Sequence, residues 1–211
     1  MEKAEIESRC GKQAWSHVLL TSGGWVKDME GGVKENIRRR FGEMLDKPAR
    51  EARVLFIPTA AIDDEAKRMV GKCRDELLNA GILPDRIDVY DMDGNLCAEA
   101  ALEYDVLYFT GGDTAHLLRR IRETGFDDII KKMVYADKVY VGASAGSIIA
   151  TPNIGDPHDP TTAGLSLVQA YLSVHQPEGT PPRMHLGLPH IPLTDRQALA
   201  VSWDGYEIVE D

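Results

Sequence analysis

Ser144 is the residue of this sequence that is best placed to act as a nucleophile. It lies in the middle of Gly142-Ala143-Ser144-Ala145-Gly146, which matches the pattern G-x-S-x-G. Residues 139–141 before it are typical of a buried strand, and the small and apolar run 147–150 after it could begin a helix. In a strand–turn–helix of this kind, the serine occupies a strained turn that exposes its Oγ atom. The alternative is a glycine-rich turn with a solvent-facing serine, and the flanking segments favour the nucleophile.

A second glycine-bearing turn follows another predicted strand. Residues 105–110 are mostly apolar and lead into Gly111-Gly112-Asp113-Thr114. If the two strands are neighbours, the amides of Gly112 and Ala145 can face the same point and form an oxyanion hole. The alternative is a tight turn in which Asp113 or Thr114 caps the next helix, and both interpretations can hold together. A phosphate-binding loop is disfavoured, because the turn has neither G-x-G-x-x-G nor G-K-[ST].

A serine nucleophile needs a base, and the base needs a group that orients it. The candidate bases are the six histidines His17, His116, His158, His175, His185 and His190. The spacing of the last three does not choose among them, and any single one is more often a surface or capped histidine than a base. Asp195 follows an apolar pair and could orient an imidazole. The alternative for Asp195 is a turn aspartate paired with Arg196.

Strands and helices alternate through most of the chain. Strands are predicted at 17–21, 53–58, 86–90, 105–110 and 139–141, and helices at 34–45, 63–80, 96–102, 115–122 and 126–134. This alternation implies right-handed crossovers and an α/β fold, with a mainly parallel sheet covered by helices on both faces. Ligands of such sheets bind beyond the carboxyl ends of the strands, where both glycine-bearing turns are expected to lie.

The last third of the chain differs from the rest in composition and in its predicted elements. Several prolines and glycines make residues 151–164 rich in loops. Leu165–Val174 is predicted to hold a strand and Ile191–Val201 another, before Trp203-Asp204-Gly205-Tyr206 marks a hairpin-like turn. We expect residues 1–211 to form a single domain, with the polar residues 1–16 as a loose lead-in.

Composition narrows the classes of partner. The net charge of −10 argues against nucleic acid and anionic membranes, because no excess of Lys and Arg is available to neutralise phosphates. The three widely spaced cysteines contain no C-x-x-C and suggest neither a disulfide framework nor a zinc site. No apolar run reaches the length of a membrane span, and the N-terminus is charged rather than signal-like. We therefore expect a cytoplasmic protein that uses no metal or cofactor.

Several motifs together resemble one family of serine peptidases. F-T-G-G-D-T-A-H-L-L at 109–118, V-G-A-S-A-G-S at 141–147 and the tail 164–201 look like the dipeptidase E branch, which also includes cyanophycinases. With R-V-L-F-I-P-T-A at 53–60, the similarity spans nearly the whole chain in the right order. The resemblance implies a three-layer α/β/α sandwich of the flavodoxin-like, class I glutamine amidotransferase-like kind.

The resemblance also implies site residues. Ser144 would be the nucleophile, His175 the base and Asp195 the acid, although the aspartyl dipeptidase has a glutamate in this third position. Gly112 and Ala145 would supply the oxyanion amides, and Gly111, Asp113 and Thr114 would lie around the substrate. The order serine, histidine, acid differs from that of the α/β-hydrolases.

The chain departs from the family in two ways. Asp113 stands where asparagine is usual, which puts a negative charge beside the expected oxyanion hole. The segment between His175 and Asp195 is short and lacks the stretch with the basic group for an acidic P1 side chain, and Arg183 and Arg196 are the nearby cations.

These features predict a serine hydrolase of small peptides. The alternatives are a non-catalytic binding or regulatory module on the same fold, and an amide or ester hydrolase of a non-peptide. The exposed sheet edges and helices expected for this fold would allow a homodimer.

Overall fold

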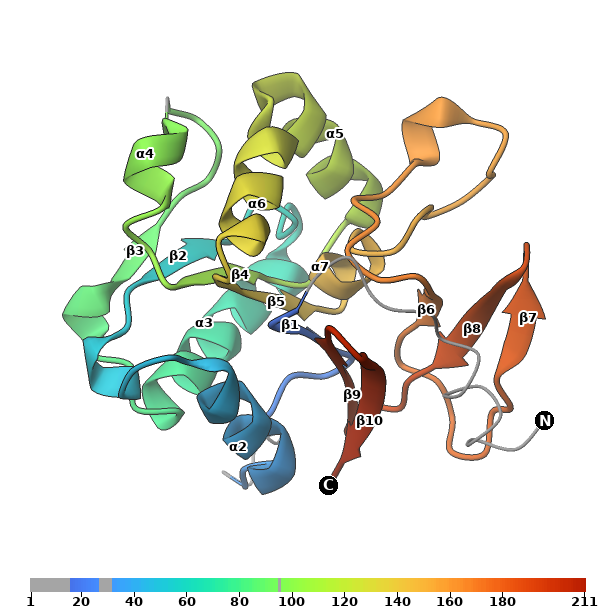
Figure 1. The fold of residues 1–211 in the computed structure, drawn as a ribbon, viewed down its shortest axis with the longest axis horizontal. Coiled ribbons are helices and arrows are strands. Elements are labelled where there is room, and N and C mark those ends of the chain that lie inside the picture. Colours follow the sequence, from blue (N-terminus) through green and yellow to red (C-terminus); the bar gives the residue numbers. More distant parts are fainter. Residues whose placement is uncertain (1–15, 27–31, 95) are drawn as a thin grey trace.

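Short apolar runs form a seven-stranded sheet at the centre of the structure (Figure 1). The computed structural model describes residues 16–26, 32–94 and 96–211. The strand order is β10-β9-β1-β5-β4-β2-β3. The strands are β1 (Val18–Thr21), β2 (Val54–Ile57), β3 (Ile87–Val89), β4 (Val106–Phe109), β5 (Val139–Ala143), β9 (Gln197–Ser202) and β10 (Gly205–Glu210). β1 to β5 pair in parallel, whereas β9 and β10 extend the sheet antiparallel beside β1. The prediction of an α/β fold with a mainly parallel sheet is confirmed.

Helices cover both faces of this sheet (Figure 1). On one face lie α4 (Ala98–Ala101), α5 (Thr114–Thr124), α6 (Phe126–Tyr135) and α7 (Ala145–Ile148), and on the other α2 (Glu35–Met44) and α3 (Asp64–Asn79). Because side chains alternate along a strand, Val18 and Leu20 join the core of the first face and Leu19 joins the second. Among the described residues, short 3-10 helices occur in the connections at Ala49–Glu51, Pro84–Arg86 and Pro160–Thr162.

The predicted elements of residues 17–150 lie within a few residues of the observed ones. Gly125 ends α5 as expected, because its φ of 67° belongs to the left-handed region that glycine adopts easily. The predicted lead-in of residues 1–16 falls, apart from Ser16, outside the described residues. No helix in the described ranges is long and apolar enough to cross a bilayer.

One prediction for the last third of the chain differs from the structure. The single strand predicted at Ile191–Val201 is wrong, because the segment contributes to two different sheets. β8 (Leu188–Pro192) pairs with β6 (Tyr171–Ser173) and β7 (Arg183–His185) in a small separate sheet, whereas β9 joins the central sheet. Residues 193–196 break the strand, and the Gln197 amide donates to the Thr194 carbonyl across a turn. Asp195 lies in this turn.

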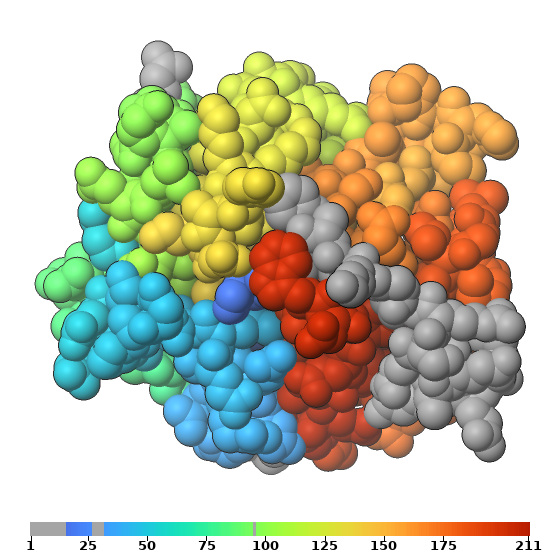
Figure 2. Space-filling view, viewed as in Figure 1, coloured from blue at the N-terminus to red at the C-terminus, as the bar shows by residue number. Residues whose placement is uncertain are grey.

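The predicted strand at Leu165–Val174 is shorter than expected, and β7 was not predicted at all. The hairpin-like turn at residues 203–206 joins β9 to β10. In the space-filling view, the red C-terminal hairpin lies against the blue segment that contains α2 (Figure 2). Because β9 of this hairpin pairs with β1, the hairpin covers the edge of β1 that the parallel strands leave open.

Candidate active site

Three turns meet at the carboxyl edge of the central sheet. β5 lies between β1 and β4, so the turn after each of these strands ends in the same region. These turns hold Ser22-Gly23-Gly24, Gly111-Gly112 and Ser144. The adjacency of β4 and β5 is the condition under which Gly112 and Ala145 can face one point.

Ser144 occupies a strained backbone conformation at the corner between β5 and α7. Its φ and ψ are 47° and −103°, a backbone conformation that residues other than glycine rarely adopt. A Cβ atom on Gly142 would lie 2.5 Å from the Gly146 backbone, and one on Gly146 would lie 2.7 Å from the Phe109 carbonyl oxygen. The turn can therefore be this tight only because both flanking residues are glycine.

Ser144, His175 and Asp195 form a continuous chain of hydrogen bonds. Ser144 Oγ lies 2.9 Å from His175 Nε2, and His175 Nδ1 lies 2.6 Å from Asp195 Oδ1. With the ring proton on Nδ1 and donated to Asp195, Nε2 is free to accept the proton of the serine hydroxyl. The three residues come from the β5–α7 corner, the loop after β6 and the turn before β9. Such a chain can activate a serine for attack on a carbonyl carbon.

The other histidines lie elsewhere. His17 contacts Ser16 and Asp137, and His190 contacts Ser173 and Arg183. His116 pairs with Arg119, His185 packs on Tyr171, and His158 lies in the loop before the last 3-10 helix. Among the described residues, His175 is the histidine that hydrogen-bonds Ser144.

The two predicted oxyanion residues lie near Ser144 in sequence or in space: Ala145 follows it directly, and Gly112 lines the same pocket. Ala145 is the first residue of α7, and the first amides of a helix have no acceptor within the helix. Gly112 has a φ of 138°, and a Cβ atom there would lie 2.0 Å from the Ala60 carbonyl oxygen. Glycine at this position therefore permits both the conformation and the close approach of the loop after β2.

Asp113 has a structural partner of its own. Its side chain accepts a hydrogen bond of 2.7 Å from the His116 amide and caps α5, as the alternative interpretation of this turn predicted. Thr114 is the first residue of the same helix. Gly111 and Gly112 line the pocket in front of Ser144, but this lining includes neither Asp113 nor Thr114.

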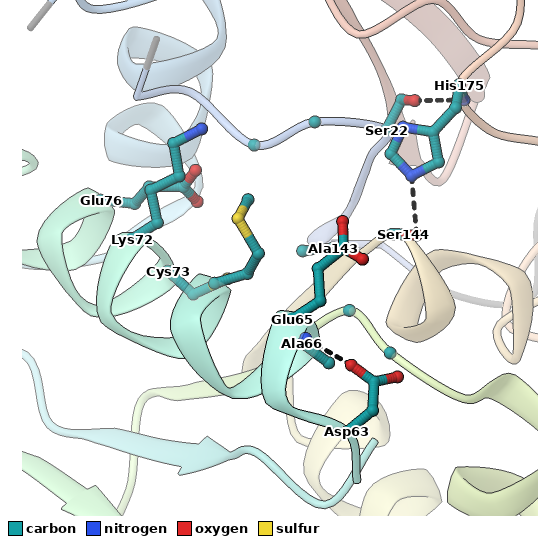
Figure 3. A pocket seen from close by; sticks show the side chains of 15 residues that line it. Ser22, Asp63, Glu65, Ala66, Lys72, Cys73, Glu76, Ala143, Ser144 and His175 are labelled. Atoms are coloured by element: carbon teal, nitrogen blue, oxygen red, sulfur yellow. Dashed lines mark hydrogen bonds between the residues drawn. The ribbon is translucent and has the colours of Figure 1, made fainter. Parts of the chain in front are cut away.

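A pocket of about 370 Å³ opens in front of Ser144 (Figure 3). One wall is the glycine-bearing turns, and the other is one side of α3 with the residue before it. That second wall presents Asp63, Glu65, Ala66, Met69, Lys72, Cys73 and Glu76. An adjoining pocket of about 450 Å³ shares Lys72 and His175 and adds Lys34 and Arg196.

The cations at these pockets differ from those expected. Arg196 lines the second pocket as anticipated, but Arg183 lies on β7 beside His190 and lines neither. Lys72 lines both pockets and was missed, because it comes from a helix far from Ser144 in the sequence. Within the described residues, no group of three His, Cys, Asp or Glu side chains could hold a metal ion.

The Asp195 carboxylate is stabilised in its ionised form. Burial alone would raise its pKa, but hydrogen bonds from His175 and Ser22 and the positive charge of Lys34 outweigh that cost and lower the pKa. Asp195 is therefore ionised at neutral pH, as a group that orients an imidazole must be.

Glu76 is a buried carboxyl group at the inner end of the pocket, only 2% exposed. Its side chain accepts hydrogen bonds from the Trp25 amide at 3.0 Å and from the Tyr108 hydroxyl at 2.5 Å. Burial raises its pKa to about 7, although these hydrogen bonds and Lys34 oppose the shift.

The raised pKa of Glu76 makes stability depend on pH. The pKa of about 7 in the folded chain exceeds the ordinary 4.5, so folding favours the protonated form. Its contribution is complete at low pH and is lost as the pH rises through about 7, a decrease of about 3 kcal/mol in the free energy of unfolding. Glu76→Gln should abolish this decrease, so the variant should gain about 3 kcal/mol relative to wild type between about pH 5 and about pH 8. Urea unfolding across this range measures the difference. Glu65→Gln, an exposed position on the same helix, is the control, and parallel curves for wild type and Glu76→Gln would contradict the prediction.

The sequence of this chain identifies its family. Residues 18–202, most of the chain, match the sequence profile of Peptidase family S51. This chain belongs to peptidase family S51. The resemblance to the dipeptidase E branch is thereby confirmed at the level of the family.

Curated relatives of this S51 family member include peptidases from several bacteria. An uncharacterized peptidase of Listeria monocytogenes, Lmo0363, is 35% identical over 101 residues, which are 48% of this chain and 49% of the relative. Peptidase E of Streptomyces coelicolor is 30% identical over 142 residues, 64% of this chain and 56% of that protein. The chain thus spans about half the length of the curated relatives it matches.

The fold of this S51 family member also matches solved structures. The crystal structure of a candidate peptidase E from Listeria monocytogenes EGD-e superposes with a TM-score of 0.72 at 23% identity, covering 94% of this chain and all of that one. A peptidase from an acI-B1 actinobacterium superposes with a TM-score of 0.62 at 16% identity, covering 93% of this chain and 88% of that one. At these identities the match concerns the fold.

Proposed function

We propose that this protein is a serine hydrolase of small peptides, with Ser144 as nucleophile, His175 as general base and Asp195 as the group that orients His175. The observation that carries the proposal is the chain of hydrogen bonds of 2.9 Å and 2.6 Å that links these side chains at a strained turn. Membership of a peptidase family supports it.

The proposed reaction proceeds through an acyl-enzyme. Ser144 Oγ attacks the scissile carbonyl carbon while His175 Nε2 takes its proton, and Asp195 stabilises the imidazolium that forms. The amides of Gly112 and Ala145 donate to the oxyanion of the tetrahedral intermediate. His175 then gives the proton to the leaving amine, and a water molecule activated by the same imidazole hydrolyses the ester on Ser144.

The pocket supports a short substrate with charged ends. A volume of about 370 Å³ is in the range of small-molecule sites and would hold a peptide of a few residues. Lys72 can meet a carboxylate, while Asp63 and Glu65 at the opposite part of the wall can meet an amine. Relatives from Nostoc and Streptomyces are named peptidase E, which is consistent with a peptide substrate.

Active-site labelling followed by a substrate screen tests the proposal. A fluorophosphonate should label Ser144, identified by mass spectrometry of the labelled peptide, and should leave the buried Ser147 unmodified. A panel of Asp-X, Gly-X and β-aspartyl dipeptides beside simple esters then identifies the bond that is cleaved. An unlabelled Ser144 in a protein that binds small molecules would instead favour a non-catalytic module. Cleavage of esters or non-peptide amides alone would retain the nucleophile and reject the peptide substrate.

Gly112→Ala should reduce kcat by about 10²–10³-fold, the usual effect of losing one oxyanion donor. The added Cβ atom would lie 2.0 Å from the Ala60 carbonyl oxygen, so the turn must move and carry the amide away from Ser144. Steady-state kinetics on the dipeptide found by the screen measures the change. Gly205→Ala is the matched control, because Gly205 has a similar φ of 147° but nothing within 4 Å of the added atom. Unchanged kcat in Gly112→Ala would remove Gly112 from the oxyanion hole.

A further inference from the structure

The loop after β1 brings a buried hydroxyl group into the site. Ser22 is 1% exposed and follows directly after the last residue of β1. Its Oγ atom lies 2.9 Å from Asp195 Oδ1 and donates to it. The same Oγ atom accepts a hydrogen bond of 2.7 Å from the His175 backbone amide. One hydroxyl group therefore contacts both the acid and the base, as Figure 3 shows for His175.

Only a group that donates and accepts at once can make both contacts. A serine or threonine hydroxyl has one donor hydrogen and two acceptor lone pairs, so it can bridge an amide and a carboxylate. Alanine would break both bonds and leave the His175 amide without this acceptor. The bridge is thus specific for the type of side chain at position 22.

The backbone of His175 needs such support. Its φ of 56° lies in the left-handed region, which costs a residue with a side chain about 1–3 kcal/mol. On one side the Ser22 hydroxyl holds the His175 amide, and on the other the Gln176 amide donates to the Leu193 carbonyl at 3.0 Å. The imidazole keeps its direction toward Ser144 because these bonds fix the strained residue.

A buried cation fixes the distance between the loop and Asp195. Lys34 is 6% exposed, and its Nζ atom donates to the carbonyls of Gly24 at 2.7 Å, Gly23 at 3.2 Å and Asp195. A Cβ atom on Gly23 would lie 3.0 Å from the Asp195 Cβ, so glycine lets the two segments approach this closely. Ser22 is therefore held beside Asp195 by the backbone as well as by its own bond.

We propose that Ser22 is a positioning residue of the active site, which holds His175 and Asp195 in the geometry that lets His175 accept the proton of Ser144. This inference rests on the proposed function. Ser22 lines the pocket, but its hydroxyl group contacts Asp195 and the His175 amide, so it acts through the two residues that it bridges. The Ser22 hydrogen bond also contributes to the lowered pKa of Asp195, together with His175 and Lys34.

Kinetics of Ser22→Ala on the dipeptide identified by the screen tests the inference. We expect kcat to fall about tenfold to a hundredfold with little change in KM, because the variant disturbs proton transfer and leaves the pocket walls in place. Without the hydrogen bond from Ser22, the Asp195 carboxylate stabilises the imidazolium of His175 more strongly. The acid limb of the kcat/KM profile should therefore move to higher pH. Loss of packing alone would not move this limb.

The matched control is Ser16→Ala. Ser16 is also a buried serine that donates to an aspartate, Asp137, but at the opposite end of β1. It should leave kcat, KM and the pH profile unchanged. Thermal melts of both variants establish that each is folded at the assay temperature, and Ser22→Thr, which keeps the hydroxyl group, should recover most of the lost kcat.

The outcomes separate this inference from the proposed function. A labelled Ser144 with unchanged kcat and pH profile in Ser22→Ala overturns the positioning role alone. A fall in kcat without a shift of the acid limb assigns Ser22 a purely structural role and also overturns it. Failure of the wild-type protein to react with the fluorophosphonate overturns the proposed function itself.

Discussion

Ser144→Ala is expected to lower kcat by about 10⁵–10⁶-fold, the loss seen when the nucleophile of a serine peptidase is removed. The variant lacks the Oγ atom that forms the acyl bond, so neither His175 nor the oxyanion amides have a reaction to assist. Alanine can adopt the same strained φ of 47° at the same cost, and the fold should remain. Residual hydrolysis reports what binding and the oxyanion hole achieve without a nucleophile.

The measurement needs protein free of contaminating peptidases. Product formation from the cleaved dipeptide gives kcat, and calorimetric titration of the inactive variant with the same dipeptide shows that binding persists. Ser202→Ala, at the far end of β9, controls for loss of a hydroxyl group elsewhere. Wild-type rates in Ser144→Ala would exclude covalent catalysis at this position.

Asp195→Asn should reduce kcat by about 10⁴-fold. The carboxylate accepts a hydrogen bond from His175 Nδ1, with 2.6 Å between Nδ1 and Oδ1, and so leaves Nε2 free to accept from the Ser144 hydroxyl. An amide nitrogen in place of the carboxylate oxygen would donate to Nδ1 and place the imidazole proton on Nε2, where it blocks acceptance. The variant should therefore keep its substrate affinity and lose proton transfer.

This variant tests the assignment for which the family resemblance was weakest, since an aspartate stands where the aspartyl dipeptidase has glutamate. Steady-state kinetics and the rate of fluorophosphonate labelling should fall together. Asp204→Asn, in the exposed turn between β9 and β10, is the control. A decrease of less than about tenfold in Asp195→Asn would show that another group orients His175.

Ser144 and its turn could be predicted from the sequence because their signal is local. The G-x-S-x-G pattern places strand, turn and helix within a dozen residues, and the steric need for glycine acts between immediate neighbours. The alternation of strands and helices likewise predicted the parallel sheet. His175 and Asp195 required the family resemblance, since nothing in their spacing distinguishes them from other histidines and aspartates.

The groups that support these residues carry no such signal. Ser22 follows β1, Lys34 precedes α2, and Glu76 lies in the last turn of α3. They come close to the site only when the sheet has formed. In the sequence Lys34 and Glu76 read as ordinary charged positions of surface helices, although both are buried. The turn S-G-G after the first strand was the available clue, because it resembles the glycine-bearing turn after β4.

Pairing of β9 with β1 brings together site residues that are synthesised at different times. Ser144 lies at the end of the parallel strand β5, whereas His175 and Asp195 come from the later residues between β6 and β9, and β9 pairs with β1. A ribosome makes the chain from its N-terminus, so a molecule synthesised only as far as α7 already holds Ser144 but has neither partner to activate it. Hydrolytic activity would then appear only after β9 has paired with β1 and Asp195 has reached His175.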